Sequence, residues 1–387
     1  MNSNSTNKPQ IIFTFPAIMG GVASFNFNII NNSSLLKCFY SKVILMHEVS
    51  EKGALFTELF KTDEQILFEY SGKENQYYLQ KRLNKLLGNN IGAIVTDNGL
   101  TMEAARRFEN PKTVFSLIHD YYYVDQQFKL GDLADVAIAH SSFFSDALFA
   151  SNPAIFANRT FYIPYGVKQL SAFPEKKKDA MNLVFLGRLE NEKGVLALYE
   201  IQEALEKLSI KVNWTIIGKG KLKEKLLGQW KGKNISFNEP KTTEEVYQLL
   251  QQQDVFIFPT IFEGTPVSIL ECLSTAVITI THDLPGGIRD IVTDGIGYRC
   301  KVNALEEFVN FIAILNNDRA LLKTMQHNCF QLAKKKYDVC KNADKYFELF
   351  LKFEPLKRKQ KNRARRLLKL DSSLFANKFS TLIRSFK

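Results

Sequence analysis

Two glutamates in the second half of the chain have a spacing that suits the binding of a polyhydroxylated ligand. Glu263 directly follows an apolar run, and Glu271 stands on the expected next helix, with seven residues between them. Carboxylates accept paired hydrogen bonds from neighbouring hydroxyl groups. Amides at the start of a helix attract an anion, and here they belong to the turn Gly264-Thr265-Pro266-Val267. The pattern therefore predicts a site for a hydroxyl-rich, negatively charged ligand.

A second charged loop has the residues to hold a diphosphate. Arg188 and Lys193 lie between an expected strand at 183–186 and an expected helix at 194–208. A guanidinium and an ammonium group at such a position can stabilise charge that forms on a leaving diphosphate oxygen. The alternative for this loop alone is an ordinary solvated charged connection.

Two weaker signals lie in the first half. Gly20 and Gly21 follow the apolar run 11–15, and paired glycines let the backbone approach a phosphate or a sugar closely. The pair is not a dinucleotide-binding fingerprint, and a simple turn is the alternative. His119 ends another apolar run, where it could hydrogen-bond a sugar hydroxyl. The alternative is a structural histidine with its hydrogen bonds satisfied.

The elements that must position these residues alternate between strands and helices, which predicts βαβ units and parallel sheets. The expected strands are 11–15, 43–46, 66–68, 93–96, 113–118, 136–139, 183–186, 213–217, 235–237, 255–258 and 277–280. The expected helices are 50–60, 74–87, 101–108, 194–208, 222–229, 243–252, 266–274 and 305–316. The fold class predicted is α/β, with two doubly wound domains that face each other across a central cleft.

A chain of 387 residues favours two domains. We expect a first domain at 1–168, a second domain at 169–354 and a basic amphipathic tail at 355–387. The linker is expected near Ile163-Pro164-Tyr165-Gly166-Val167 and the lysine-rich run 174–179, because proline, glycine and charge mark connections.

Charge and cysteine content limit the binding partners and the cellular compartments that are expected for this chain. The tail carries +10 of the net charge of +11, so the body of the chain lacks a broad positive face for nucleic acid. Five cysteines without a C-x-x-C pair indicate a reducing compartment. The polar first ten residues do not resemble a secretory signal, and no apolar run is long enough to span a membrane.

Taken in order, these motifs resemble those of the family-4 retaining glycosyltransferases (glycosyl transferases group 1), which have the GT-B fold. The resemblance extends from about residue 11 to about residue 351. It includes the glycine and glutamate pairs above, together with the linker sequence, Gly187-Arg188, Lys193-Gly194, Ile217-Gly218-Lys219-Gly220 and Gly286-Gly287-Ile288. The chain departs from the family at Tyr165, where asparagine is usual, and at Cys272, where alanine is common. These departures leave the identity of the sugar open.

The resemblance implies a nucleotide-sugar donor and roles for individual residues. Arg188 and Lys193 would hold the donor diphosphate, and Glu271 would bind the ribose hydroxyls. Glu263, with the amides of Gly264 to Val267, would contact the transferred sugar. His119 would lie near that sugar, and Gly20 and Gly21 would lie against phosphate or acceptor. The resemblance also implies retention of anomeric configuration, with no metal and no cofactor.

The sequence gives fewer signals for the role of the tail and for the class of acceptor. Dense cations at 357–366 followed by apolar residues at helical spacing suit an anionic membrane surface; a solvated or disordered tail is the alternative. We expect a cytoplasmic enzyme, peripheral on the inner face of the membrane, that acts on a glycan or lipid-linked acceptor in polysaccharide or lipopolysaccharide biosynthesis. The main rival is a catalytically silent GT-B protein in a membrane-associated assembly complex. A basic-tailed nucleic-acid binder is less favoured.

Overall fold

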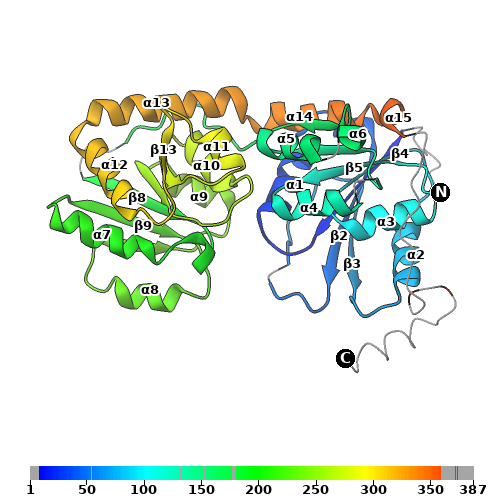
Figure 1. Ribbon diagram of the computed structural model, residues 1–387, viewed down its shortest axis with the longest axis horizontal. Helices are drawn as coiled ribbons and strands as arrows, with labels where there is room; N and C mark the ends of the chain where they lie inside the picture. The colour runs from blue at the N-terminus through cyan, green and yellow to red at the C-terminus, as the bar shows by residue number, and fades with distance from the viewer. Residues whose placement is uncertain are drawn as a thin grey trace. The chain divides into compact units, whose positions relative to one another are not determined.

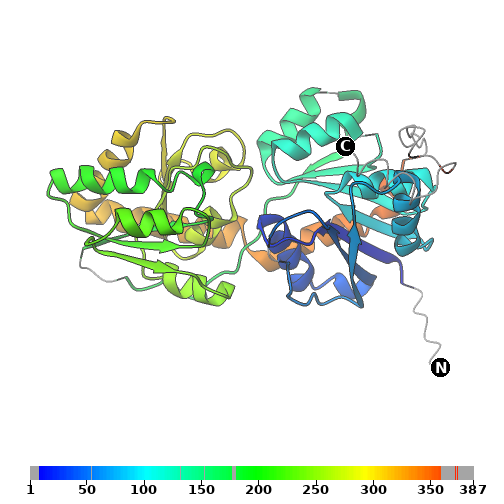
Figure 2. The ribbon, with the colours of Figure 1, turned by 90° about the horizontal axis from the view of Figure 1, so that it is seen from below.

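The computed structural model describes residues 8–53, 55–130, 132–151, 153–176, 180–358, 371 and 373. The chain divides into two compact units, one formed by Met1–Pro164 with Cys340–Lys387 and the other by Tyr165–Val339. Each unit contains one parallel sheet with helices on both of its faces (Figures 1 and 2). The two doubly wound α/β domains predicted from the sequence are therefore present.

The first unit has a seven-stranded sheet in the order β3-β2-β1-β4-β5-β6-β7. Its strands are β1 (Gln10–Pro16), β2 (Tyr40–Glu48), β3 (Glu64–Tyr70), β4 (Gly92–Thr96), β5 (Thr113–Ile118), β6 (Val136–Ala139) and β7 (Thr160–Tyr162). Its helices are α1 (Gly21–Asn32), η1 (Leu36–Cys38), α2 (Gln76–Leu87), α3 (Gly99–Arg107), α4 (Tyr121–Leu130), α5 (Ser142–Ser151), α6 (Pro153–Phe156), α14 (Val339–Phe350) and α15 (Phe353–Leu356).

The second unit has a six-stranded sheet in the order β10-β9-β8-β11-β12-β13, which repeats the winding of the first. Its strands are β8 (Met181–Leu186), β9 (Val212–Ile217), β10 (Ile235–Asn238), β11 (Val255–Phe258), β12 (Ile278–His282) and β13 (Gly297–Cys300). Its helices are η2 (Asn191–Lys193), α7 (Ala197–Lys207), α8 (Lys223–Gln229), α9 (Thr243–Leu250), α10 (Val267–Ser274), α11 (Gly287–Ile291), α12 (Leu305–Asn317) and α13 (Arg319–Lys336).

Strand β1 shows why consecutive residues of the central strands are apolar, with no alternation between apolar and polar side chains. Ile12 belongs to a buried cluster with Leu79 and Leu83 of α2. Its neighbour Phe13 points to the other face, where its ring centroid lies 6.0 Å from those of Phe347 and Phe350 in α14. A strand covered by helices on both faces buries every side chain, and it therefore appears in the sequence as a continuous apolar run.

The return of the chain to the first unit differs from the expected domain boundary. The sequence-based division grouped residues 340–354 with the second domain, whereas the structure groups them with the first. Helix α14 packs there through Phe350, which lies 5.2 Å from Phe115 between ring centroids. Asp344 also accepts hydrogen bonds from the Ser33 hydroxyl and the Ser34 amide, both at 2.8 Å. Burial of this aromatic face determines which unit the helix joins.

Residues 50–60 were expected to be helical and are not. This segment pairs with the loop after β1: Leu55 forms a β-bridge with Ile18, and the Phe56 amide donates to the Ala17 carbonyl at 2.7 Å. Phe56 and Phe60 are buried, with their ring centroids 5.4 Å apart. Backbone pairing with a distant loop and aromatic burial outweigh the helical spacing of the apolar residues.

Within the described part of the chain, no helix is long and apolar enough to cross a membrane. Most of the expected basic tail lies outside the described residues, including the cationic run from 359 onward. Residues of the tail that the structure describes contact the first unit. The Arg358 amide donates to Asp135 at 3.1 Å, and Asp371 accepts the Gln76 amide at the start of α2 at 3.0 Å.

Candidate functional site

The candidate site of the second unit lies where the strand order of its sheet reverses. Strand β8 starts the sheet, and β11 pairs with it on the side opposite β9. In open parallel sheets, ligands bind beyond the carboxyl ends of the strands at this switch point. The loop 187–194 follows β8 and the loop 259–266 follows β11, so the predicted residues Arg188, Lys193 and Glu263 all come from these two loops.

The two loops are held together through their backbones. Gly194 has a φ of +67°, and a Cβ there would lie 1.9 Å from the carbonyl oxygen of Pro259. Beside it, the Ile261 amide donates to the Glu192 carbonyl at 3.0 Å. Only glycine permits this approach and this left-handed conformation. The contact fixes the position from which Lys193 extends.

Lys193 and Glu263 form an ion pair between side chains that are 16% and 11% exposed. Burial raises the pKa of the Glu263 carboxyl, and the positive charges of Lys193 and Arg188 act in the opposite direction. The Lys193 ammonium also lies 5.9 Å from the centre of the Phe258 ring. A partly desolvated pair interacts more strongly than an exposed one, so the cation is fixed at the end of β11.

Arg188 is placed differently from Lys193. Its side chain is 66% exposed and forms an ion pair with Glu190 at 2.6 Å. It is nevertheless near enough to the site to lower the pKa of Glu263. The two predicted cations therefore belong to one electrostatic environment, one held within the site and one at its solvent side.

The predicted turn at 264–267 leads directly into α10. Pro266 is the N-cap residue of this helix, and no side chain caps its first amides. The turn is supported by the next loop, because the Gly287 amide donates to the Gly264 carbonyl at 2.9 Å. The Thr265 hydroxyl is buried without a hydrogen-bond partner among the described residues. Uncapped amides and an unpaired hydroxyl can both bind an oxygen-rich ligand.

Glu271 lies in the second turn of α10, as predicted. Burial alone raises the pKa of its carboxyl to about 7. In the part of the chain that the structure describes, its carboxylate has neither an ion-pair nor a hydrogen-bond partner. A carboxylate in this state has unfilled acceptor positions, which hydroxyl groups of a ligand can occupy.

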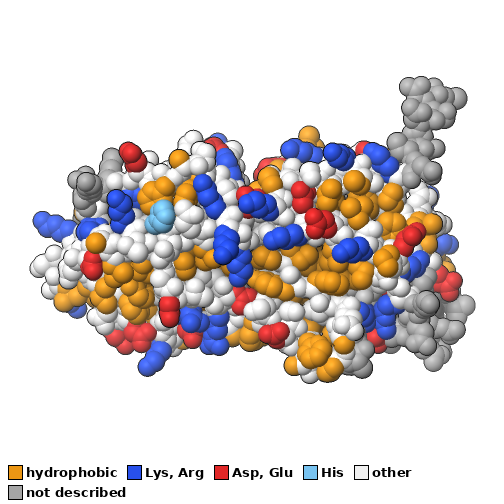
Figure 3. Space-filling model, turned by 90° about the horizontal axis from the view of Figure 1, so that it is seen from above, with side chains coloured by type: hydrophobic (Ala, Val, Ile, Leu, Met, Phe, Trp, Pro, Cys, Tyr) orange, Lys and Arg blue, Asp and Glu red, His pale blue; other side chains and the backbone are white. Residues whose placement is uncertain are grey.

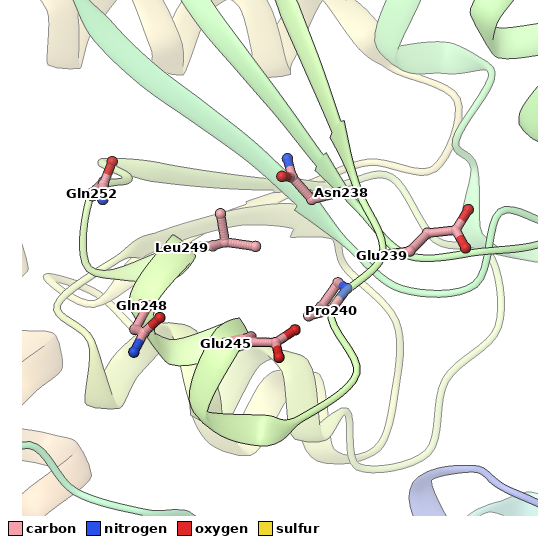
Figure 4. A pocket seen from close by; sticks show the side chains of 7 residues that line it. All are labelled: Asn238, Glu239, Pro240, Glu245, Gln248, Leu249 and Gln252. Atoms are coloured by element: carbon pink, nitrogen blue, oxygen red, sulfur yellow. The ribbon is translucent and has the colours of Figure 1, made fainter.

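A cavity of about 370 Å³ lies between the end of β10 and the helix α9 (Figure 4). It is lined by Asn238, Glu239, Pro240, Glu245, Gln248, Leu249 and Gln252. Figure 4 shows Asn238 and Leu249 on opposite walls, from β10 and α9. Residues 238–240 are the segment in which the sequence suggested base recognition by backbone groups. The side-chain amides of Gln248 in α9 and of Gln252 after it were not singled out from the sequence.

In the first unit, Gly20 and Gly21 lie exposed at the start of α1. A Cβ at either position would meet no described atom within 4 Å. Neither glycine is therefore required by packing within the chain. The N-terminus of α1 has no side-chain cap, so its first amides are exposed to the open space beside these glycines.

His119 lies inside the first unit, with 4% of its surface exposed. Its Nε2 is 3.5 Å from Oδ2 of Asp97, and its ring lies 4.7 Å from that of His140. Burial raises the pKa of Asp97 and lowers that of His140. Sequence reasoning missed Asp97 and His140. Each directly follows an apolar strand, as His119 does, and that position was the available signal.

Among the described residues, no three His, Cys, Asp or Glu side chains are arranged to hold a metal ion. All predicted site residues of the second unit lie along the carboxyl edge of its sheet, whereas Gly20, Gly21 and His119 lie along that of the first.

Comparison with known proteins finds a family match within the second unit. Residues 167–336 match the family model of glycosyl transferases group 1. The curated relatives include the Escherichia coli UDP-Gal:alpha-D-GlcNAc-diphosphoundecaprenol alpha-1,3-galactosyltransferase. It is 26% identical over 28% of this chain and 27% of its own length. The putative teichuronic acid biosynthesis glycosyltransferase TuaC of Bacillus subtilis is 25% identical over 41% of this chain and 39% of its own. The matches thus span well under half of these two relatives.

Solved structures extend the likeness to both units. HepE of Anabaena, solved with UDP and glucose, has a TM-score of 0.71 at 15% identity, covering 89% of this chain and 99% of its own. The lipopolysaccharide outer core galactosyltransferase WaaB, solved in apo form, has a TM-score of 0.64 at 18% identity, covering 89% of this chain and 100% of its own. The predicted GT-B fold class is confirmed by this similarity.

Proposed function

We propose that this chain, whose residues 167–336 form a glycosyl transferases group 1 domain, is a retaining glycosyltransferase. It transfers a sugar, of hexosyl type, from a nucleotide-sugar donor to a glycan or glycolipid acceptor without a metal ion or other cofactor. The observation that carries the proposal is the Lys193–Glu263 ion pair at the switch point of the second sheet. It places a cation and a carboxylate beside an uncapped helix start, which together suit a diphosphate joined to a sugar.

The donor would lie along the carboxyl edge of the second sheet. Lys193 and Arg188 would contact the diphosphate, and the free carboxylate of Glu271 would accept hydrogen bonds from the ribose hydroxyls. The cavity beyond β10 would receive the nucleobase, since it is large enough for a heterocyclic ring and is lined by amides and carboxylates. UDP-sugars are the first donors to test, because HepE was solved with UDP and glucose.

In the proposed reaction, the bond from the anomeric carbon to the diphosphate oxygen breaks, and the acceptor oxygen bonds to that carbon on the same face. The acceptor proton passes to the departing diphosphate, which leaves as a nucleoside diphosphate. Lys193 and Arg188 would stabilise the negative charge that grows on this leaving group. Glu263 would hold the Lys193 ammonium and contact the transferred sugar.

The first unit would supply the acceptor side. Gly20 and Gly21 leave open space at the start of α1, where a sugar or phosphate could approach the backbone. His119 would act close to the transferred sugar, and because it is buried against Asp97 we assign it a positioning role. Met19 and Val49, on the loops after β1 and β2, and Tyr122, at the start of α4, have exposed side chains at the same sheet edge. They suit an acceptor with apolar surface.

The acceptor class is proposed from the relatives. One acts on a sugar linked to diphosphoundecaprenol, and another is assigned to teichuronic acid synthesis. We propose a similar polysaccharide or lipopolysaccharide-type acceptor for this chain, at the inner face of the cytoplasmic membrane. The basic segment 355–387 would contact anionic lipid. Removing residues 359–387 should abolish binding to phosphatidylglycerol vesicles; unchanged binding would contradict the membrane role.

The first experiment is a thermal-shift and hydrolysis screen of the purified chain against UDP-, GDP-, ADP- and TDP-sugars. One donor should raise the melting temperature, because a ligand that binds only the native state stabilises it. Glu271→Gln should weaken that donor about tenfold, since it removes a charge from hydroxyl recognition. A control variant, Glu200→Gln on the exposed surface of α7, should bind like wild type. Donor binding without hydrolysis or transfer to any acceptor would favour the catalytically silent partner protein instead.

A further inference from the structure

Thr260 lies buried beside the Lys193–Glu263 pair, and its position was not singled out from the sequence. It comes shortly after the end of β11, and its side chain is fully buried. Its carbonyl lies 2.9 Å from Nδ1 of His282. Because a carbonyl only accepts hydrogen bonds, this ring nitrogen must carry the hydrogen. His282 is the last residue of β12 and is 2% exposed, so the neighbouring strand fixes the backbone at Thr260.

The Thr260 hydroxyl has more acceptors within reach than hydrogens to donate. Its Oγ1 lies 3.0 Å from the Glu192 carbonyl oxygen and 3.2 Å from that of Phe262. A hydrogen bond from this hydroxyl to the Glu263 carboxylate also helps to lower the pKa of Glu263. A hydroxyl donates one hydrogen and rotates to suit its partner. The hydroxyl can therefore change its acceptor without any movement of the backbone.

The Glu192 carbonyl does not depend on the Thr260 hydroxyl. It accepts the Ile261 amide at 3.0 Å, so it keeps one hydrogen bond when the hydroxyl turns away. A carbonyl that is still paired loses little, whereas a buried carboxylate without a donor is costly. Of the acceptors around this hydroxyl, Glu263 therefore gains the most from it.

Glu263 needs a donor because its charge is held inside the second unit. Figure 3 shows Lys and Arg side chains spread over the surface of the face that carries α13, whereas the Glu263 side chain is 11% exposed and its pKa is raised by burial. Among the described residues, two cations act on it. Arg188 is 66% exposed and already paired with Glu190. Lys193 of η2 is thus its main charged contact.

A bound diphosphate would compete for that contact. The proposed donor site assigns Lys193 to the diphosphate, and an ammonium group that turns toward phosphate oxygens moves away from its carboxylate. Glu263 would then lose its nearest opposite charge in a largely buried place. Either a proton or another hydrogen-bond donor would have to replace the ammonium.

We propose that Thr260 is a positioning residue for sugar transfer, and that its hydroxyl donates to the Glu263 carboxylate when Lys193 turns to the donor diphosphate. The inference rests on the proposed function. Glu263 stays ionised and in place through this exchange, so it can contact the sugar while Lys193 stabilises the leaving group. No covalent bond forms or breaks at Thr260, and its hydroxyl keeps its hydrogen.

Proton uptake on nucleotide binding tests this exchange. UDP, GDP, ADP and TDP, the leaving groups of the candidate donors, are titrated into the full chain at about pH 6 in two buffers of different ionisation enthalpy. The difference in heat gives the number of protons taken up. Thr260→Val removes the hydroxyl and keeps the shape, so Glu263 should take a proton instead. Uptake should exceed that of wild type by at least about 0.3 proton per nucleotide, and affinity should fall about threefold more between pH 6 and pH 8.

Matched variants separate this role from the general loss of a buried hydroxyl. Thr260→Ser keeps the hydroxyl and should return proton uptake to the wild-type value. Thr281→Val removes another fully buried hydroxyl, which donates to the Phe258 carbonyl at 2.7 Å, and should bind like wild type. Thr260→Ala also removes the hydroxyl and replaces Thr260→Val if valine disturbs folding. Glu271 is present in all of these variants, so its own titration affects each of them equally.

Equal proton uptake in wild type, Thr260→Val and Thr281→Val would overturn the proposal, as would uptake in Thr260→Ser that matches Thr260→Val. Binding with unchanged uptake overturns the exchange alone and leaves the glycosyltransferase proposal standing. If wild type binds none of the four nucleotides, the donor site itself is absent, and the proposed function fails together with the exchange.

Discussion

Lys193 and Glu263 stand seventy positions apart in the sequence and form an ion pair between two loops of one sheet edge. Neither side chain is fully buried, so the pair remains accessible to a ligand. The same ammonium can therefore hold Glu263 in the free enzyme and turn toward a diphosphate when donor is present.

Replacing Lys193 with alanine should slow turnover about a hundredfold, because the charge on the leaving diphosphate loses one of the two cations proposed to stabilise it. The donor dissociation constant should change much less, and kcat and KM measured separately would distinguish the two effects. Lys233→Ala, which breaks an ion pair with Glu206 outside the site, is the matched control. If both variants behave alike, Lys193 has no special role in transfer.

Glu271 should make stability depend on pH. Its pKa is about 7 in the folded chain against an ordinary value of 4.5, so the folded state binds the proton more tightly. The free energy of unfolding should therefore be highest below about pH 4.5 and fall by up to about 3 kcal/mol as the pH rises through 7.

Urea denaturation between pH 5 and 8 tests this dependence on Glu271. Glu271→Gln should flatten the profile and make the chain more stable than wild type at pH 8, while Glu200→Gln should leave the wild-type slope. A wild-type slope in Glu271→Gln would assign the dependence to another group.

Gly194→Ala should destabilise the second unit by at least about 2 kcal/mol. The alanine would have to adopt a left-handed φ and move away from the Pro259 carbonyl. Gly228→Ala provides the opposite control, because no atom lies within 4 Å of its Cβ and it sits in α8. It should raise stability by about 0.5–1 kcal/mol. Equal losses in the two variants would show that the contact at Gly194 is not required.

Asp371→Ala should weaken the attachment of the tail to the first unit. Asp371 is 5% exposed and accepts the Gln76 amide at the start of α2, beside the N-cap residue Asn75. Loss of one capping hydrogen bond costs about 1 kcal/mol, which a thermal melt resolves as a fall of a few degrees. Asp294→Ala, an exposed turn residue, should leave the melt unchanged.

The sequence predicted the central strands of both sheets and the outer strands β3 and β10, and it missed the outer strands β7 and β13. Strand β13 has only Gly297–Cys300, and β7 only Thr160–Tyr162, so neither forms an apolar run long enough to stand out. The helix predicted at 50–60 was wrong for a related reason. Its apolar residues have helical spacing, but the backbone of Leu55 pairs with that of Ile18, in a loop 37 positions earlier, which the local pattern does not reveal.

The candidate site was predictable where charged residues follow apolar strands. Arg188, Lys193 and Glu263 were singled out in this way, and Glu271 by its place on the following helix; their roles stay predictions. The pairing of Lys193 with Glu263 was not predicted, because it depends on the contact between Gly194 and Pro259. The interior position of His119 was also missed, since burial against Asp97 and His140 arises from strand order and not from neighbours in the sequence.

The glycine contacts at this sheet edge also limit which substitutions and insertions the second unit can accept. A Cβ at Gly194 would meet the Pro259 backbone, and a Cβ at Gly218 would lie 1.9 Å from the carbonyl oxygen of Gly187. Loops that touch main chain to main chain cannot shift apart or accept insertions without losing the contact. New donor preferences would therefore arise by exchange of exposed side chains such as Ile261 and Phe262. For protein engineering, these outward positions are the ones to randomise, and the glycines are the ones to leave fixed.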